Sequence, residues 1–163
     1  MIAFLRIALP VLAIHLLEGS LLRGAGPVLP RIDFLLLFLA FTAFPRGAAR
    51  GALIGAAIGV FRAFAWSGAA GGEPLAFLAA GLFAGWAYRK LVGESGPGLL
   101  LILFGTVLVH DLVALAGLLR HGFLPFFFRF VLETIPAGIL TAAVGALLRY
   151  GRIRFRRARE AAA

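Results

Sequence analysis

The chain has 163 residues, of which 62% are apolar and only 14% are charged, and its net charge is +9. In soluble domains about a quarter of the residues are charged. The composition of this chain therefore excludes a water-soluble enzyme domain, a disordered chain and a collagen-like repeat. It predicts an all-α polytopic membrane protein. Six transmembrane helices of about 20 residues would use about 120 residues and leave short connections within one compact bundle.

The first apolar segment, residues 2–22, is predicted to be a retained helix rather than a cleaved signal peptide. Arg6 lies inside the apolar run instead of before it, and His15 and Glu18 interrupt the remainder. No small-residue cleavage pattern follows the run. These features differ from the basic start, apolar middle and cleavage site of a signal peptide.

Five further apolar segments follow, separated by turns rich in glycine and proline. Helices are favoured over barrel strands because the runs do not alternate and are about twice the length of a strand. The second segment is short for a crossing, so it is expected either to extend over Pro45 and its neighbours or to lie deep in the bundle. Pro136 should kink the last helix. The predicted segments are 32–44, 48–66, 75–91, 99–119 and 125–148.

The distribution of basic residues predicts that both termini are cytoplasmic. With six crossings, eleven basic residues fall on the side of the termini and three, Arg23, Arg31 and Arg120, on the other side. Cytoplasmic loops carry such an excess of Lys and Arg. The eleven are Arg6, Arg46, Arg50, Arg89, Lys90, Arg149, Arg152, Arg154, Arg156, Arg157 and Arg159.

The domain organisation predicted is one transmembrane domain, residues 1–149, and a basic cytoplasmic tail, residues 150–163. A basic run directly after an apolar helix attracts anionic headgroups of the inner leaflet, so the high positive charge indicates the lipid bilayer and not nucleic acid. Docking of a cytoplasmic protein on the tail stays open as an alternative. The predicted headgroup contacts are Arg152, Arg154, Arg156 and Arg157.

Four glycines recur at every fourth position of the third segment, namely Gly47, Gly51, Gly55 and Gly59. Such a stripe leaves one helix face without side chains, so another backbone can approach closely. Two interpretations are open: packing inside the same bundle, or a groove for the transmembrane helix of another protein. For the partner site we add two aromatic residues at the start of the last helix, Phe126 and Phe127, which are otherwise expected to anchor the interface.

Several ionisable residues lie inside the apolar segments. A lone charge at the centre of a bilayer costs at least about 2.5–3.5 kcal/mol, so these groups should pair or reach water. Arg129 and Glu133 are four residues apart and can bridge on one helix face. For Asp111 we expect an inter-helix pair with Arg62 or Arg129. The predicted intramembrane polar network is Arg62, His110, Asp111, Arg129 and Glu133.

A catalytic or metal-binding role is not expected for these groups. The chain has no cysteine, and Ser20, Ser67 and Ser95 lie at helix ends or in loops without a nucleophile-elbow pattern. The histidines and carboxylates lack the spacing of a metal site. We therefore predict no enzyme activity, no metal and no cofactor. A structural ionic bridge is favoured, and a proton or substrate pathway stays open.

The whole layout resembles the rod shape-determining protein MreD family of bacteria. The resemblance is carried by Pro30-Arg31-Ile32-Asp33 ahead of the second helix and by Arg46-Gly47 through Gly59 in the third. The resemblance extends over the glycine-rich loop before Pro74-Leu75. It also covers the fourth helix, which ends in the basic pair Arg89-Lys90. Where the family usually carries an aspartate after the last glycine, this chain has Ala63, with Arg62 beside it.

The resemblance implies a non-enzymatic scaffold or regulator of the cell-elongation complex in the bacterial inner membrane. It implies direct binding of the transmembrane helix of MreC. Through MreC the chain would reach RodA and its partner transpeptidase, and MreB on the inner side, and so influence peptidoglycan synthesis and cell shape. It also implies a fold similar to the S components of energy-coupling-factor transporters. The alternative function is therefore a vitamin-binding S component that uses outer groups such as Trp66, Glu73 and Arg129.

Overall fold

The computed structural model of the chain describes residues 9–14, 32–65, 72–91 and 96–161, and these residues contain helices and turns but no strand. The predicted all-α fold is confirmed. Residues 9–14 are helical. The elements that follow are α2 (Phe34–Ala43), α3 (Ala48–Ala65), α4 (Glu73–Leu91), α5 (Gly96–Ala114), the 3₁₀ helix η1 (Leu115–His121), α6 (Phe123–Arg129), the π-helix η2 (Phe130–Thr134) and α7 (Ile135–Ala161).

Three stretches of the described chain are long and apolar enough to cross a bilayer: Ala48–Ala65, Pro97–His121 and Phe123–Arg152. These stretches indicate a membrane protein. Helix α2 is apolar but has only 10 residues. Helix α4 has 19 residues and carries Glu73 in its first turn and two basic residues in its last. The first predicted segment lies outside the described residues except for 9–14.

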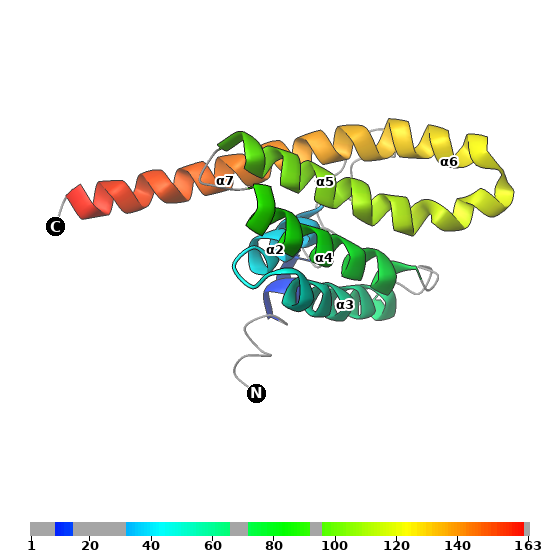
Figure 1. Cartoon of the computed structure of the whole chain (residues 1–163), viewed down its shortest axis with the longest axis horizontal. Helices are drawn as coiled ribbons and strands as arrows, with labels where there is room; N and C mark the ends of the chain where they lie inside the picture. Colours follow the sequence, from blue (N-terminus) through cyan, green and yellow to red (C-terminus); the bar gives the residue numbers. More distant parts are fainter. Residues whose placement is uncertain (1–8, 15–31, 66–71, 92–95, 162–163) are drawn as a thin grey trace.

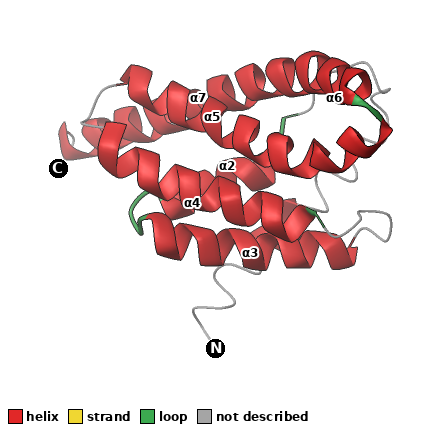
Figure 2. Ribbon diagram, turned by 45° about the vertical axis from the view of Figure 1, so that its right-hand side comes forward, coloured by secondary structure: helices red, strands yellow, loops and turns green. Residues whose placement is uncertain are grey.

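The helices are arranged in layers with α2 near the centre (Figures 1 and 2). Helices α3 and α4 lie side by side, and α5 and α7 form a second pair that packs on them through α4. Helix α2 contacts all four of these helices. Its leucines at 35, 36, 37 and 39 are therefore buried on every side, which explains why its sequence is apolar without a polar face. Of the two alternatives for this short segment, the structure supports the deep position, since α2 ends at Ala43, before Pro45.

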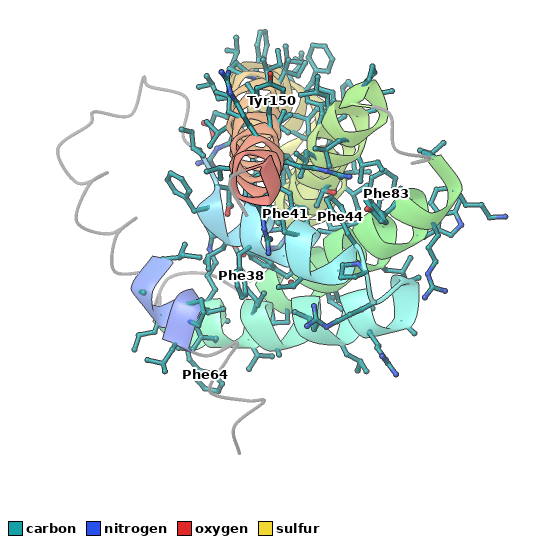
Figure 3. All side chains as sticks on the ribbon, turned by 90° about the vertical axis from the view of Figure 1, so that its left-hand side faces the viewer. Phe38, Phe41, Phe44, Phe64, Phe83 and Tyr150 are labelled. Atoms are coloured by element: carbon teal, nitrogen blue, oxygen red, sulfur yellow. The ribbon has the colours of Figure 1, made fainter. Side chains whose placement is uncertain are left out.

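Aromatic side chains divide between the interior and the exterior of these layers (Figure 3). Phe44 is buried and stacks on Tyr88 with ring centroids 4.6 Å apart. Phe64 and Tyr150, in contrast, are largely exposed. Exposed large apolar side chains are expected on a helix bundle that is surrounded by lipid. Lipid tails are as apolar as these side chains, so burial brings no hydrophobic gain.

The glycine stripe of α3 packs against α4 of the same chain. A methyl group on Gly51 would overlap the carbonyl oxygen of Gly81, and one on Gly55 would overlap the carbonyl oxygen of Phe77. At Gly59 it would lie 2.6 Å from the Cα of Pro74. The backbones of the two helices thus touch along the stripe, and no second helix fits there. The prediction that Gly47, Gly51, Gly55 and Gly59 receive a partner's helix is wrong, and the alternative of internal packing holds.

The α2–α3 turn ends at Gly47, whose φ of +80° is a backbone conformation that side chains disfavour. The Arg89 side chain near the end of α4 lies directly over this glycine. Arg149 of α7 lies 5.9 Å from the ring centroid of Tyr88, also in the last turn of α4. Arg89 of α4 and Arg149 of α7 therefore lie at one end of the bundle, at the level of the α2–α3 turn, and we call this the basic end. Helix α7 continues past this end as a projecting helix (Figure 1).

The last predicted helix changes geometry ahead of Pro136, where a kink was predicted. The chain widens into the π-helix η2 over Phe130–Thr134 and returns to α geometry at Ile135. Proline has no N–H to donate to the preceding turn and its ring clashes with a carbonyl there, so a local change of helix geometry is a common outcome. Toward the C-terminus, α7 runs without a break past residue 150, where the basic tail was predicted to begin.

Candidate functional site: a polar cluster inside the bundle

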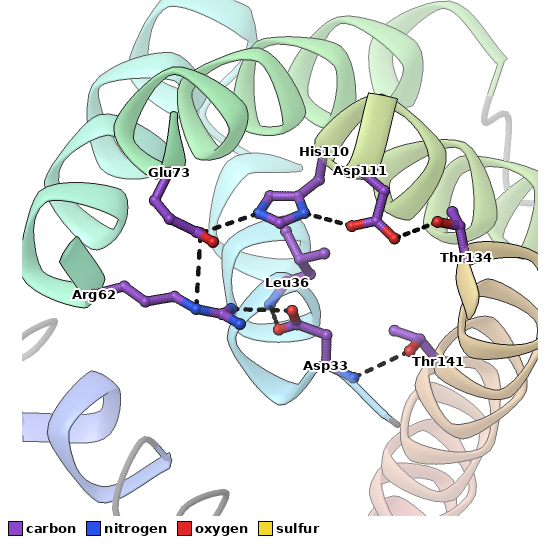
Figure 4. Close-up of polar contacts among 8 residues, drawn as sticks. All are labelled: Asp33, Leu36, Arg62, Glu73, His110, Asp111, Thr134 and Thr141. Atoms are coloured by element: carbon purple, nitrogen blue, oxygen red, sulfur yellow. Dashed lines mark hydrogen bonds and ion pairs between the residues drawn. The ribbon is translucent and has the colours of Figure 1, made fainter. Parts of the chain in front are cut away.

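Seven polar side chains meet inside the bundle, near the end opposite the basic end (Figure 4). The position of five of them follows from the chain direction, and two threonines of the last helical segment join these five. One residue precedes the first turn of α2, one lies in the last turn of α3, one begins α4, and two lie near the end of α5. Successive helices run in opposite directions, so these positions share one end. The seven are Asp33, Arg62, Glu73, His110, Asp111, Thr134 and Thr141.

Asp33 connects three helices. Its Oδ1 accepts a hydrogen bond from the backbone N–H of Leu36 at 2.9 Å, which caps the N-terminus of α2. Its Oδ2 accepts from Nη1 of Arg62 at 3.1 Å, and its own N–H donates to Oγ1 of Thr141 at 3.2 Å. One residue thereby begins α2 and ties it to α3 and α7.

Arg62, Glu73 and His110 form the middle of the cluster. Oε2 of Glu73 lies 3.7 Å from Nε of Arg62 and 3.6 Å from Nε2 of His110. Both separations are ion-pair contacts longer than a hydrogen bond, and neither Oε2 nor the His110 Nε2 has a hydrogen-bond partner in the described part of the chain. The Phe77 ring lies under Arg62 at 5.4 Å and meets the His110 ring edge-on at 4.6 Å.

His110 and Asp111 continue the cluster toward the π-helix. Nδ1 of His110 lies 2.8 Å from Oδ1 of Asp111, and Oδ2 of Asp111 accepts the hydroxyl proton of Thr134 at 2.7 Å. The His110 side chain is only 5% exposed and Thr134 is fully buried. Because Thr134 is the last residue of η2, the hydrogen bond fixes the π-helix against α5.

The cluster thus joins α2, α3, α4, α5 and the η2–α7 segment by consecutive charged or hydrogen-bonded contacts. Three carboxylates face one guanidinium and one imidazole, and these contacts offset part of the cost that an isolated charge would carry there. Within the described ranges no group of three or more histidine or acidic side chains is placed to hold a metal ion. The arrangement is suited to holding the helix ends in register, and a histidine between two carboxylates is also chemically able to transfer a proton.

The structure brings together three of the five residues predicted for the network: Arg62, His110 and Asp111. The predicted pairing of Asp111 with Arg62 or Arg129 is wrong, because Arg62 pairs with Asp33 and Glu73. Arg129 and Glu133 do form the predicted bridge, with Nε of Arg129 3.1 Å from both carboxylate oxygens. This pair lies outside the cluster, with side chains 53% and 61% exposed.

Sequence reasoning missed Asp33, Thr134 and Thr141 as members. Asp33 carries a signal, because an aspartate directly before an apolar helix is a typical N-cap. The two threonines give no such signal in the sequence. A threonine inside an apolar helix usually donates its hydroxyl proton to a backbone carbonyl of the preceding turn, as Thr106 does to Ile102 at 2.7 Å. Glu73 was predicted only as part of an outer pocket. His15, Glu18 and Trp66 lie outside the described residues.

Three of the other predicted contact residues, Phe127, Arg152 and Arg154, are exposed. Phe127 is exposed and stacks on Phe123 with centroids 5.8 Å apart, and Phe126, which is half-buried, stacks on Phe130 at 5.7 Å. Arg152 is exposed at the start of the α7 extension. Arg154 is exposed as well, while Arg156 and Arg157 lie where only the backbone is described.

Comparison of the chain with protein-family models, with curated proteins and with solved structures gives no significant match.

Proposed function

We propose that the chain is a non-enzymatic scaffold of the bacterial inner membrane, of the MreD kind. In this proposal it crosses the membrane six times with both termini in the cytoplasm. It binds the transmembrane helix of MreC within the complex that also contains RodA, its partner transpeptidase and MreB. By this binding it regulates peptidoglycan synthesis and cell shape.

The topology in this proposal is supported by the basic end of the bundle. Arg46 in the α2–α3 turn, Arg89 at the end of α4 and Arg149 in α7 come from separate parts of the chain and meet there. A concentration of arginine and lysine at one end of a transmembrane bundle is typical of its cytoplasmic side. The α7 extension with its further arginines leaves the bundle at that same end (Figure 1).

The observation that carries the scaffold function is the internal pairing of the polar cluster. Its charged side chains contact one another across α2, α3, α4 and α5, from Asp33 to Asp111, and Asp111 accepts a hydrogen bond from Thr134 of η2. A connected polar network specifies one arrangement of helices more strictly than apolar contacts do. A scaffold needs such a fixed shape, because it must present one surface to its partner.

Co-purification with MreC tests this function. The chain and the MreC of the same organism are co-expressed, extracted in mild detergent and separated by size exclusion, and we expect both proteins in one peak. The control is an MreC whose transmembrane helix is replaced by a polyleucine helix of equal length, which should elute alone. Separate elution of natural MreC from a folded chain would refute the proposal.

A second candidate, an S component that captures a vitamin, is favoured by one observation. Glu73 Oε2 and His110 Nε2 are buried polar atoms without a hydrogen-bond partner among the described residues, and a polar ligand could supply one. Native mass spectrometry of the purified protein separates the two functions. A retained small molecule together with a transporter ATPase module would favour the S component and count against the scaffold.

A further inference from the structure

The ion pair of Arg129 and Glu133 lies on the outer surface of the last helical segment. Nε of Arg129 bonds to both carboxylate oxygens, and no other hydrogen bond of Arg129 occurs among the described residues. The two terminal nitrogens of the guanidinium carry four further N–H groups. These donors are therefore available on a surface where more than half of each side chain is exposed.

Two rows of residues run along this surface at helical spacing. Leu124, Phe128 and Leu132 form an exposed apolar row, and Pro125, Arg129 and Glu133 form the row beside it. We call these six residues the α6 face. It continues from α6 into the π-helix, where the hydrogen bond from Thr134 to Asp111 holds the backbone on the opposite side.

The ion pair lies within the apolar part of this segment. The candidate span begins at Phe123, so six residues, or about 9 Å of helix, separate its start from Arg129. The residues between them are apolar, and the basic residues of the hairpin, Arg120 and His121, lie beyond. Charged groups inside an apolar span normally face protein or water, because lipid offers them no hydrogen bonds.

We infer that the α6 face is the docking surface for a partner's transmembrane helix that carries a hydrogen-bond acceptor at the level of Arg129. The inference rests on the proposed function, and it places the MreC helix on α6 and η2 instead of the glycine stripe of α3. The charges favour this occupant over a lipid phosphate. Glu133 neutralises Arg129 and repels an anion, whereas a neutral or dipolar acceptor on a helix meets the free donors without that repulsion.

An exchange of the two charges tests the inference. The double variant Arg129→Glu with Glu133→Arg keeps an ion pair at the same spacing but reverses the polarity presented to the partner. We measure binding of MreC to the chain in nanodiscs of phosphatidylcholine and expect a loss of affinity of at least tenfold. Size exclusion and thermal unfolding should match the natural chain, because both side chains are exposed.

A matched pair of apolar variants completes the test. Leu132 on the α6 face is 68% exposed and Leu53 on α3 is 71% exposed, so tryptophan should fit at either position in the free chain. We expect Leu132→Trp to weaken MreC binding at least tenfold and Leu53→Trp to change it less than twofold.

Each outcome decides the inference. If the natural chain binds MreC and the variants bind equally well, the α6 face is not the docking surface although the proposed function stands. The docking surface is likewise excluded if the charge exchange abolishes binding to phosphatidylglycerol vesicles but leaves MreC binding intact, since the pair is then a headgroup site. If the natural chain does not bind MreC at all, the proposed function fails first, and the inference fails with it.

Discussion

Gly51 of α3 and Gly81 of α4 face each other so closely that a methyl group on either would overlap the carbonyl oxygen of the other. Their contact shows how two helices without a hydrophobic driving force between them associate in lipid, through extended van der Waals contact of their backbones. The same contact means that substitutions in the stripe act on the fold of the chain itself.

Gly81→Ala should therefore destabilise the bundle. The added methyl group cannot be accommodated without separating α3 from α4, and overpacking of this kind costs about 1–3 kcal/mol or more. Thermal unfolding in detergent measures the effect. Gly151→Ala is the matched control, because nothing lies within 4 Å of the added carbon and alanine is the better helix former by about 0.5–1 kcal/mol. A stability of Gly81→Ala equal to that of the natural chain would contradict the packing described.

Removal of the central cation should loosen the polar cluster. Arg62→Ala leaves the carboxylates of Asp33 and Glu73 without their cation, and breaking a largely buried pair costs about 3 kcal/mol. We expect a clear drop in the unfolding temperature. Arg50→Ala, which removes an exposed charge from the same helix, should change the free energy of unfolding by less than about 0.5 kcal/mol. Equal effects of the two variants would mean that the cluster does not stabilise the bundle.

The hydrogen bond between Thr134 and Asp111 should hold the π-helix against α5. Thr134→Val keeps the shape of the side chain but removes the donor, and an unsatisfied buried acceptor costs about 1–3 kcal/mol. Hydrogen exchange of the amides over Phe130–Thr134 should accelerate at least tenfold. Thr134→Ser retains the hydroxyl and should exchange like the natural chain. Unchanged exchange in Thr134→Val would show that Pro136 alone sets the geometry of η2.

The proposed topology can be read from single cysteines, since the natural chain has none. His121→Cys lies in the exposed α5–α6 hairpin and Gly151→Cys in the exposed part of α7. In intact cells a membrane-impermeant maleimide should label residue 121 and leave residue 151 unlabelled until the membrane is opened. The reverse pattern would invert the orientation, and labelling of both in intact cells would refute the six-crossing arrangement.

Local properties of the chain were readable from the sequence. The apolar runs and the turns between them placed both ends of α3 and α4 to within two residues, because these helix breaks follow glycine and proline directly. The fifth segment was predicted to end at residue 119, whereas α5 ends at Ala114 and continues as the 3₁₀ helix η1. The bridge between Arg129 and Glu133 was predictable for the same reason, since its two members lie one helical turn apart.

Contacts between helices were decided only by the tertiary structure. The spacing of Gly51, Gly55 and Gly59 predicts a close approach but does not say which backbone makes it, and only the packing places α4 there. Arg62 forms its ion pair with Asp33 and not with Asp111 because the last turn of α3 lies beside the first turn of α2. Such pairings depend on how separate helices are placed relative to one another, and a charge pattern along one helix carries no information about that placement.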